Sequence, residues 1–389
     1  EGPVADLSMA QIGELDAGSW FDARFAGERL LTLPDRVVGS PESLAPLVKV
    51  VDMRQELRDG HVGMFSRALL QHMDRVFDGE GRVILFLNRR GSASQVQCRN
   101  CGYSRRCSRC DSNMTYHRAD NGVPAALICH YCSRRIRYTN ACPVCHEHRM
   151  APSGTGTQAV VDEVDRIYPQ AGTIRWDRDV ARTARAHEEI LSTFLHGSER
   201  VLVGTQMVAK GLDIPSVELV GVISADTALS IPDFRSGERA FQILTQVAGR
   251  AGRGKNRGDV IMQTFQPDHY AIQAAVEQDF DAFYRTEIEL RRSHANPPFT
   301  SIVRLGISDP DAETAQTEAF EFADLLGRAS LASGMESVQI LGPSPSFPMR
   351  LRGVHRWHIL LKGSSPVDLL DEVQLPRGWT VDVDPVSVA

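Results

Sequence analysis

The stretch Val83-Ile-Leu-Phe-Leu-Asn-Arg-Arg-Gly91 decides how the rest of this 389-residue sequence is interpreted. Five consecutive apolar residues, 83–87, predict a strand that is buried on both faces, as in a parallel sheet. Polar and turn-forming residues, 88–91, then end the strand. The stretch therefore predicts a core strand of an α/β domain.

Helical and extended patterns alternate further along the chain. Apolar residues at helical spacing cover 160–167, and a second helix is expected over 183–195. Short apolar strands are expected at 174–176, 201–203 and 219–223, followed by a helix from about Glu238. This alternation predicts a doubly wound α/β lobe with a parallel sheet, formed by residues 1–91 and 151–285.

All eight cysteines fall between these two parts of the lobe. They form four Cys-x-x-Cys pairs: Cys98 and Cys101, Cys107 and Cys110, Cys129 and Cys132, Cys142 and Cys145. Each pair can direct two thiolates at one ion, so four pairs can supply two tetrahedral zinc sites. Disulfides or inert buried thiols are the alternative, but disulfides are usually spread through a small secreted domain. We therefore expect an inserted zinc-binding module over residues 92–150.

A predicted hairpin suggests how the four pairs combine. Residues 113–117 and 125–128 read as two short strands around the turn Asn121-Gly122. Closing this hairpin brings the two inner pairs together and leaves the two outer pairs to meet at its base. The alternative joins the first two pairs directly, and the chain would then have to reverse within residues 102–106, which is possible but cramped.

The cysteine segment is basic on an acidic chain. Residues 98–137 include eight arginines and two aspartates, a net charge of +6, whereas the whole chain carries -6. A local polyanion-binding or partner-binding surface is one interpretation. The other interpretation is that these arginines lie on the surface of the module and interact only with solvent.

The pattern changes again over residues 286–389. Strands are expected at 301–307, 338–341, 354–361 and 379–383, with helices at 312–329 and 367–373. This β-α-β-β-α-β order predicts a ferredoxin-like α+β domain, a topology that by itself implies no function. Arg350, Arg352, Arg356 and Lys362 surround its predicted central hairpin, where they either contact phosphate or form a solvated loop.

Composition sets broad limits. Hydrophobic residues make up 42% and charged residues 24% of the chain, as in ordinary soluble proteins. No apolar run approaches the roughly 20 residues of a membrane-spanning helix, so we expect a cytoplasmic protein without membrane contact. Because the chain begins at Glu1 rather than Met, we also expect it to be part of something longer.

Polar residues follow the predicted strand 201–203. Ligands of α/β folds bind beyond the carboxyl ends of parallel strands, which makes these residues candidates for contacts with phosphate. The candidates are Thr205, Gln206, Lys210, Gly211 and Asp213.

A second polar motif is Gln246-Val-Ala-Gly-Arg250-Ala-Gly-Arg253. If it is helical, Gln246, Arg250 and Arg253 fall within an arc of about 60°, opposite the apolar Phe241, Leu244 and Ala248. Two guanidinium groups and an amide on one ridge suit a triphosphate whose charge must be neutralised during cleavage. A solvated arginine face is the alternative.

With these two motifs, the sequence resembles the second motor lobe of superfamily 2 helicases and, within them, the family of primosomal replication restart helicases, PriA (primosomal protein N′). Residues 201–213 resemble helicase motif V, and residues 246–253 resemble motif VI. The resemblance covers almost the whole chain and corresponds to the carboxyl half of that family. It implies that the α/β lobe is a RecA-like second helicase lobe. Further matching stretches are 84–91, the four cysteine pairs, Gly154-Thr-Gly-Thr157, Pro232-Asp-Phe-Arg235 with Glu238-Arg239, Asn296-Pro-Pro-Phe299 and Asp382-Val-Asp-Pro385.

The resemblance implies roles for individual residues. One zinc ion would be bound by the two outer cysteine pairs and the other by the two inner pairs. Thr205, Gln206 and Lys210 would lie near the DNA strand, Gly211 and Asp213 near the nucleotide. Gln246, Arg250 and Arg253 would form the catalytic motif, with both arginines facing the γ-phosphate. Further DNA contacts are expected from Asn88, Arg89, Arg350, Arg352 and Arg356.

The resemblance also implies the activity and the partners. Family members recognise stalled or forked DNA, move 3′-to-5′ with ATP hydrolysis, and recruit single-strand binding protein, primosome proteins and the loading machinery of the replicative helicase. We expect a monomer.

One departure from the family leaves two functions open. The sequence has no G-x-x-x-x-G-K-[ST] phosphate loop and no acidic metal-binding strand motif, which belong to a first motor lobe. The chain is either half of an ATP-dependent motor or a non-enzymatic scaffold that loads the primosome. ATP and magnesium are expected as cofactors only if an intact first lobe lies upstream.

Overall fold

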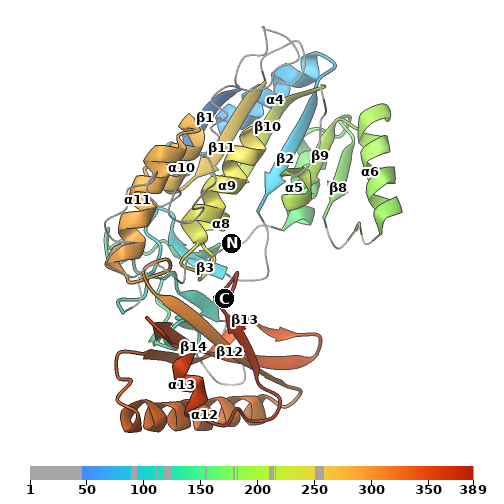
Figure 1. The fold of residues 1–389 in the computed structure, drawn as a ribbon. Helices are drawn as coiled ribbons and strands as arrows, with labels where there is room; N and C mark the ends of the chain where they lie inside the picture. The colour runs from blue at the N-terminus through green and yellow to red at the C-terminus, as the bar shows by residue number, and fades with distance from the viewer. Residues whose placement is uncertain are drawn as a thin grey trace, which may run out of the picture.

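The computed structural model describes residues 46–88, 94–109, 112–117, 124–153, 156–177, 180–181, 183–209, 214, 216–249 and 258–388. Figure 1 shows an α/β lobe at the top, a C-terminal domain at the bottom and the cysteine-bearing strands between them. Among the described residues, no helix is long and apolar enough to cross a membrane.

A six-stranded parallel sheet forms the centre of the α/β lobe, in the order β1-β11-β10-β2-β9-β8. The predicted strand is β2 (Arg82–Leu87), and its last five residues are buried. The other strands are β1 (Leu47–Asp52), β8 (Thr173–Trp176), β9 (Val201–Gly204), β10 (Val217–Ser224) and β11 (Asp259–Thr264).

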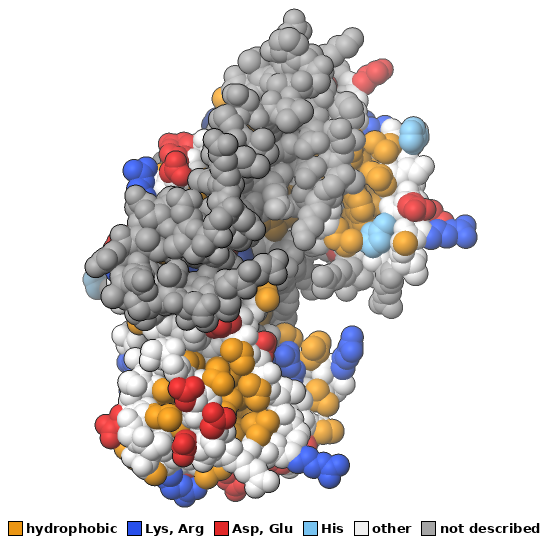
Figure 2. Space-filling view, in the orientation of Figure 1, with side chains coloured by type: hydrophobic (Ala, Val, Ile, Leu, Met, Phe, Trp, Pro, Cys, Tyr) orange, Lys and Arg blue, Asp and Glu red, His pale blue; other side chains and the backbone are white. Residues whose placement is uncertain are grey.

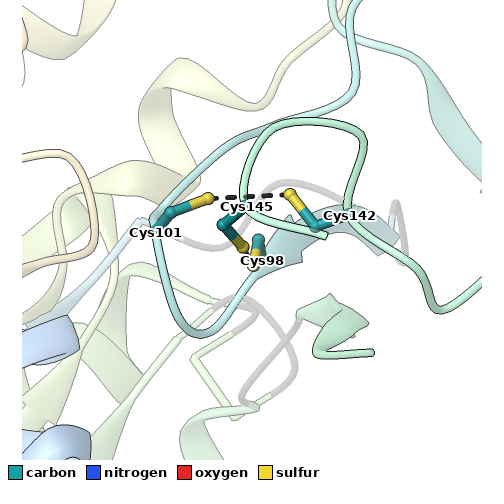
Figure 3. Close-up of side chains that lie close together, drawn as sticks. All are labelled: Cys98, Cys101, Cys142 and Cys145. Carbon is teal, nitrogen blue, oxygen red and sulfur yellow. Dashed lines mark hydrogen bonds between the residues drawn. The ribbon is translucent and has the colours of Figure 1, made fainter. Parts of the chain in front are cut away.

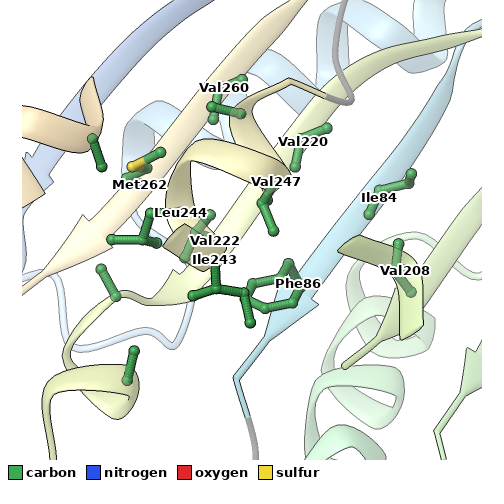
Figure 4. Close-up of a cluster of buried hydrophobic side chains, with 14 of the residues drawn as sticks. Ile84, Phe86, Val208, Val220, Val222, Ile243, Leu244, Val247, Val260 and Met262 are labelled. Carbon is green, nitrogen blue, oxygen red and sulfur yellow. The ribbon is translucent and has the colours of Figure 1, made fainter. Parts of the chain in front are cut away.

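Alternate residues of β2 face two separate apolar cores. Val83, Leu85 and Leu87 pack with helices α4 (Arg67–Asp78) and α5 (Thr157–Ile167). Ile84 and Phe86 face the opposite side and pack with α9 (Ser236–Ala248), as Figure 4 shows. Because both faces are covered, the strand must be apolar throughout. The predicted doubly wound lobe is confirmed, although β1 and β11 were not predicted.

Further helices complete the lobe. Thr183 caps α6 (Ala184–His196), since its side chain accepts a hydrogen bond from the amide of Ala186. The remaining helices are α3 (Met53–Arg58), α7 (Gln206–Ala209), α8 (Asp226–Leu229), α10 (Tyr270–Glu277) and α11 (Phe280–Ser293).

The cysteine segment forms its own antiparallel sheet in the order β6-β5-β4-β3-β7. The predicted hairpin is present, because β4 (Thr115–His117) pairs with β5 (Ala126–Ile128). The other strands are β3 (Ser94–Cys98), β6 (Arg135–Arg137) and β7 (Met150–Ser153). Since β7 pairs with β3 up to Ser153, the module extends three residues past the expected end at 150.

The C-terminal domain has the predicted ferredoxin-like order, with the sheet β13-β14-β12-β15. Its elements are β12 (Ser301–Asp309), α12 (Ala312–Ala332), β13 (Gln339–Leu351), β14 (Val354–Gly363), α13 (Asp368–Asp371) and β15 (Thr380–Val383). The expected boundary at 286 falls inside α11, so we place it after Ser293. Acidic and apolar side chains share the visible face of this domain, with basic ones at its rim (Figure 2).

Candidate metal centre and nucleic-acid interface

Four cysteines converge at the base of the inserted module. Cys98 ends β3 and Cys101 lies in the turn that follows, whereas Cys142 and Cys145 come from a second turn before β7. The Sγ atoms of Cys98 and Cys145 lie 3.6 Å apart, as do those of Cys101 and Cys142 (Figure 3). All four Sγ atoms lie within 4.8 Å of one another.

These distances fit a metal better than a disulfide. Sulfurs that are each about 2.3 Å from one tetrahedral zinc ion lie about 3.8 Å apart, close to the observed separations. A disulfide would require a separation of about 2.05 Å. The donor set, four thiolates in a closed cluster, is that of a structural zinc site.

Three cysteines converge near the β4–β5 hairpin. The Sγ atoms of Cys107, Cys129 and Cys132 lie within 4.8 Å of one another, and those of Cys107 and Cys132 are 3.6 Å apart. Cys110 lies outside the described residues. The structure therefore brings the outer pairs together at one site and groups described members of the inner pairs at another, as nested pairing requires.

Three of the cysteine pairs lie in the same type of backbone turn. After Cys98, Cys129 and Cys142, the residue four positions later donates its amide to the cysteine carbonyl, at 2.9 to 3.0 Å. These donors are Gly102, Ser133 and His146, and each has a positive φ. The turn directs both sulfurs of a pair to the same side, which explains the x-x spacing.

The thiols of the base site have unequal proton affinities before metal binds. Burial raises the pKa of Cys101 to about 12. A hydrogen bond with the side chain of Asn100 lowers the pKa of Cys145 to about 6. Because a zinc-bound sulfur is a thiolate, binding must release the protons that remain, so affinity rises with pH.

Direct contacts attach the module to the α/β lobe. Gln97, which is buried in β3, donates to the carboxylate of Asp226 at 3.2 Å. Asp226 also accepts from the hydroxyl of Thr264 and the amide of Phe265. The guanidinium group of Arg99 lies 4.8 Å from the ring centre of Phe265. These contacts place the base site against the carboxyl end of β11.

The module also packs against the C-terminal domain. Its apolar core includes Ile302 and Leu360 from β12 and β14. Ser133 lies 2.8 Å from the hydroxyl of Ser344, and buried His130 contacts the carbonyl of Pro345. The module is therefore wedged between the lobe and the C-terminal domain.

Two predicted DNA-contacting residues lie side by side at the carboxyl edge of the lobe. Asn88 follows β2 and Thr205 follows β9, and these strands pair, with Phe86 opposite Gly204. Both side chains are largely buried, at 4% and 8% exposed. Gln206 begins α7. Arg89, Lys210, Gly211 and Asp213 lie outside the described residues.

The helical interpretation of motif VI requires a correction. Phe241, Leu244 and Ala248 are buried in α9, and Gln246 is exposed, as the helical pattern predicts. However, the helix ends at Ala248 and is capped by Gly249. A helical wheel therefore cannot place Arg250 and Arg253, which lie outside the described residues.

The predicted basic cluster of the C-terminal domain is split. Arg350, Arg352 and Arg356 surround the turn between β13 and β14, where Arg350 and Arg352 are exposed. Lys362 lies at the other end of β14, nearly buried, and donates to Asn296 and to the carbonyl of His294. The prediction of a single cluster was wrong for Lys362, because the ten-residue strand β14 places this residue far from the hairpin turn.

Sequence reasoning assigned no role to the Pro232–Arg235 stretch, which holds the C-terminal tail. The carboxylate of Asp233 is fully buried, pairs with Arg239 at 2.9 Å and accepts from Ser387 at 2.8 Å. Arg235 donates to the carbonyl of Pro385 at 2.8 Å. The only available signal was the quoted family pattern, because the contacts with Pro385 and Ser387 join residues about 150 positions apart.

Comparison with known proteins connects these parts. Three families match separate segments: "PriA DNA helicase Cys-rich region (CRR) domain" at residues 107–137, "Helicase conserved C-terminal domain" at 177–255, and "Primosomal protein N C-terminal domain" at 292–386. The replication restart protein PriA of Bacillus subtilis is 42% identical over 333 residues, 86% of this chain. The chain belongs to the PriA family of replication restart proteins.

Other PriA relatives match over similar lengths. Replication restart protein PriA of Synechocystis is 37% identical over 92% of the chain, and that of Treponema pallidum is 35% identical over 95%. The chain spans 40%, 43% and 55% of the lengths of these three PriA proteins. Its zinc-ribbon segment and cysteine clusters make it a zinc-binding member of the PriA family.

A solved structure of S. cerevisiae Dbp5 bound to RNA and ADP BeF3 matches part of this PriA-family chain. The match covers 64% of this chain and 45% of the Dbp5 chain. Its sequence identity is 12% and its TM-score is 0.31, which is too low to establish a shared overall structure.

Gly102 supplies a test of how the base site is positioned. Its φ is +77°, and a Cβ there would lie 2.0 Å from the carbonyl oxygen of Phe265. Gly102→Ala should therefore destabilise the protein by about 2 kcal/mol or more and speed zinc transfer to a chelator. Urea unfolding and a chromogenic zinc chelator measure the two effects.

Gly353→Ala is the matched control. Gly353 also has a positive φ, +87°, but no heavy atom lies within 4 Å of the position that a Cβ would take there. It should show only the backbone strain, about 1 kcal/mol, with no change in zinc transfer. Equal effects of the two variants would contradict close packing of the base site on the lobe.

Proposed function

We propose that this chain forms the second motor lobe, zinc module and C-terminal DNA-binding domain of an ATP-dependent 3′-to-5′ DNA helicase that acts in replication restart. The supporting observation is that the zinc module follows β2 in the sequence and contacts the carboxyl ends of β10 and β11, on the same edge of the sheet as Asn88 and Thr205. The module thus borders the edge where α/β folds bind ligands. The alternative, a primosome-loading scaffold without motor activity, gains no support from the structure or the relatives.

The proposal assigns roles to the motor residues. Thr205, Gln206 and Lys210 contact the DNA strand, with Asn88 and Arg89 beside them. Gly211 and Asp213 border the nucleotide. Gln246, Arg250 and Arg253 form the catalytic motif, in which the arginines neutralise charge on the γ-phosphate. ATP and magnesium bind only when a first lobe supplies the phosphate loop.

The proposal also specifies metals and partners. One zinc ion is bound by Cys98, Cys101, Cys142 and Cys145, and a second by Cys107, Cys110, Cys129 and Cys132. The partners are forked and single-stranded DNA, single-strand binding protein, primosome proteins and the loading machinery of the replicative helicase. The protein acts in the cytoplasm as a monomer.

The two-ion arrangement predicts a selective loss of metal. The wild-type chain, purified without chelators, should contain two zinc ions. Cys107→Ser should lower this to about one, because the base site uses none of the inner pairs. Elemental analysis by mass spectrometry measures the content. Cys98→Ser is the reciprocal variant, and loss of both ions from Cys107→Ser alone would argue against independent nested sites.

DNA binding should depend on salt and on the β13–β14 hairpin. If Arg350 and Arg352 contact phosphates, reversing both charges to glutamate should weaken binding to forked DNA. The slope of log K against log salt should then flatten by about two units. Fluorescence anisotropy over a salt series measures both quantities.

The matched control reverses Arg328 and Arg377, two exposed arginines of the same domain. Arg328 lies in the last third of α12 and Arg377 lies shortly before β15, away from the hairpin, so their reversal should leave the slope nearly unchanged. If both pairs flatten the slope equally, net charge and not the hairpin governs binding.

The chain alone should not hydrolyse ATP. Arg250 and Arg253 can stabilise the γ-phosphate only if another element holds the β- and γ-phosphates and magnesium. A coupled ATPase assay with single-stranded DNA should therefore show no turnover above background. In a longer protein with a first lobe, Arg250→Ala should reduce turnover about a thousandfold, by analogy with arginine fingers. DNA-stimulated turnover by the chain alone that Arg250→Ala abolishes would refute this expectation.

A further inference from the structure

A cavity of about 420 Å³ lies where the lobe, the zinc module and the C-terminal domain meet. The lobe contributes the start of α9, the start of α10 and the end of α11. The module contributes Arg106, Arg109 and Asn113, and the C-terminal domain contributes Gln339, Leu341 and Lys362. This volume is within the range of pockets that bind small ligands.

Cations outnumber carboxylates in this three-way cavity. Arg106, Arg109, Arg291 and Lys362 line it, against Asp233 and Glu287. Asp233 pairs with Arg239 at 2.9 Å, and Arg291 pairs with both Glu287 at 2.8 Å and Glu238 at 2.6 Å. The positive excess therefore comes from Arg106, Arg109 and Lys362. Arg106 and Arg109 are exposed at the module side. The excess of positive charge, on a chain whose net charge is -6, suits an anionic ligand.

Other side chains of the cavity suit a base. The His269 ring stacks on Tyr270, with ring centres 4.7 Å apart. Its Nδ1 accepts from the amide of Ala271, so a neutral ring carries its proton on Nε2. Gln339 and Asn296 add amide groups, which pair well with the edges of bases. A nucleotide combines a phosphate, a hydrogen-bonding base edge and a flat ring, which suit the arginines, the amide groups and the His269 ring of the cavity.

The position of the cavity favours nucleic acid. Leu229 and Gln266 follow β10 and β11, so the cavity opens at the same carboxyl edge as Asn88 and Thr205. The sheet order is β11-β10-β2-β9, which separates the β11 and β9 ends by three strand spacings, roughly 14 Å. A short segment of single-stranded DNA that crosses this edge is long enough to extend from Thr205 to the cavity.

We propose that the three-way cavity binds one nucleotide of a DNA single strand that crosses the carboxyl edge of the motor lobe. The inference rests on the proposed function, because it presupposes that DNA lies along this edge. The lobe, the module and the C-terminal domain then all contact DNA where they meet. The bound strand helps to hold the module and the C-terminal domain in position on the lobe.

Gln339→Glu tests the charge requirement. The substitution adds one negative charge at an exposed, isosteric position of the cavity. It should weaken binding of a labelled single-stranded oligodeoxynucleotide about tenfold. Gln374→Glu makes the same change at an exposed position of the same domain outside the cavity, and should leave affinity unchanged.

Leu290→Trp tests the same cavity without altering charge. Leu290 lines it from α11 and is 40% exposed, so a larger ring there should fill the space and also weaken binding. Leu331→Trp, at a position of α12 that is 67% exposed, is its control. Unchanged zinc content and thermal unfolding show that each variant is folded.

The outcomes separate this inference from the proposed function. If the wild-type chain binds no DNA, the proposed function fails and this inference fails with it. If the wild-type chain binds DNA and both cavity variants match their controls, only the cavity inference is overturned. It is also overturned if the variants lose binding of a tetra-aspartate peptide but retain DNA affinity, because the occupant would then be an acidic protein segment.

Discussion

Thiolate coordination at the base of the module is the interaction on which the arrangement of the three parts depends. Cys101 and Cys142 lie 41 residues apart in sequence, yet their sulfurs are 3.6 Å apart. Four thiolates this close are held together by a cation, and structural zinc sites contribute on the order of 10 kcal/mol or more to folding.

The base site matters beyond the module because the apolar core of the module is shared with the C-terminal domain. Its buried cluster is completed by Ile302 and Leu360 of the C-terminal domain. On the other side, Gln97 is hydrogen-bonded to Asp226, a carboxylate that also organises the end of β11. Loss of the metal would therefore loosen the contacts of the module with both neighbours.

A second connection joins the C-terminal domain directly to the motor lobe. Asp233, Arg235 and Arg239 hold residues 385–388 at the start of α9. The same helix ends at Ala248, two residues before Arg250 in the sequence. One helix thus has the C-terminal tail at its first turn and the stretch predicted to be motif VI after its last turn.

The sequence alone determined those features that depend on local pattern. The apolar run at 83–87 requires burial on both faces, the four cysteine pairs require metal, and the β-α-β-β-α-β order leads to a ferredoxin-like sheet. The same reasoning predicted the β4–β5 hairpin from a turn and two short strands. Tertiary structure decided what local pattern cannot encode, namely which distant groups meet. It ended α9 before Arg250, moved Lys362 away from the arginine hairpin, and brought the C-terminal tail to Asp233. Each of these depends on packing and hydrogen bonds between segments far apart in the chain, and no periodicity or spacing carries that information.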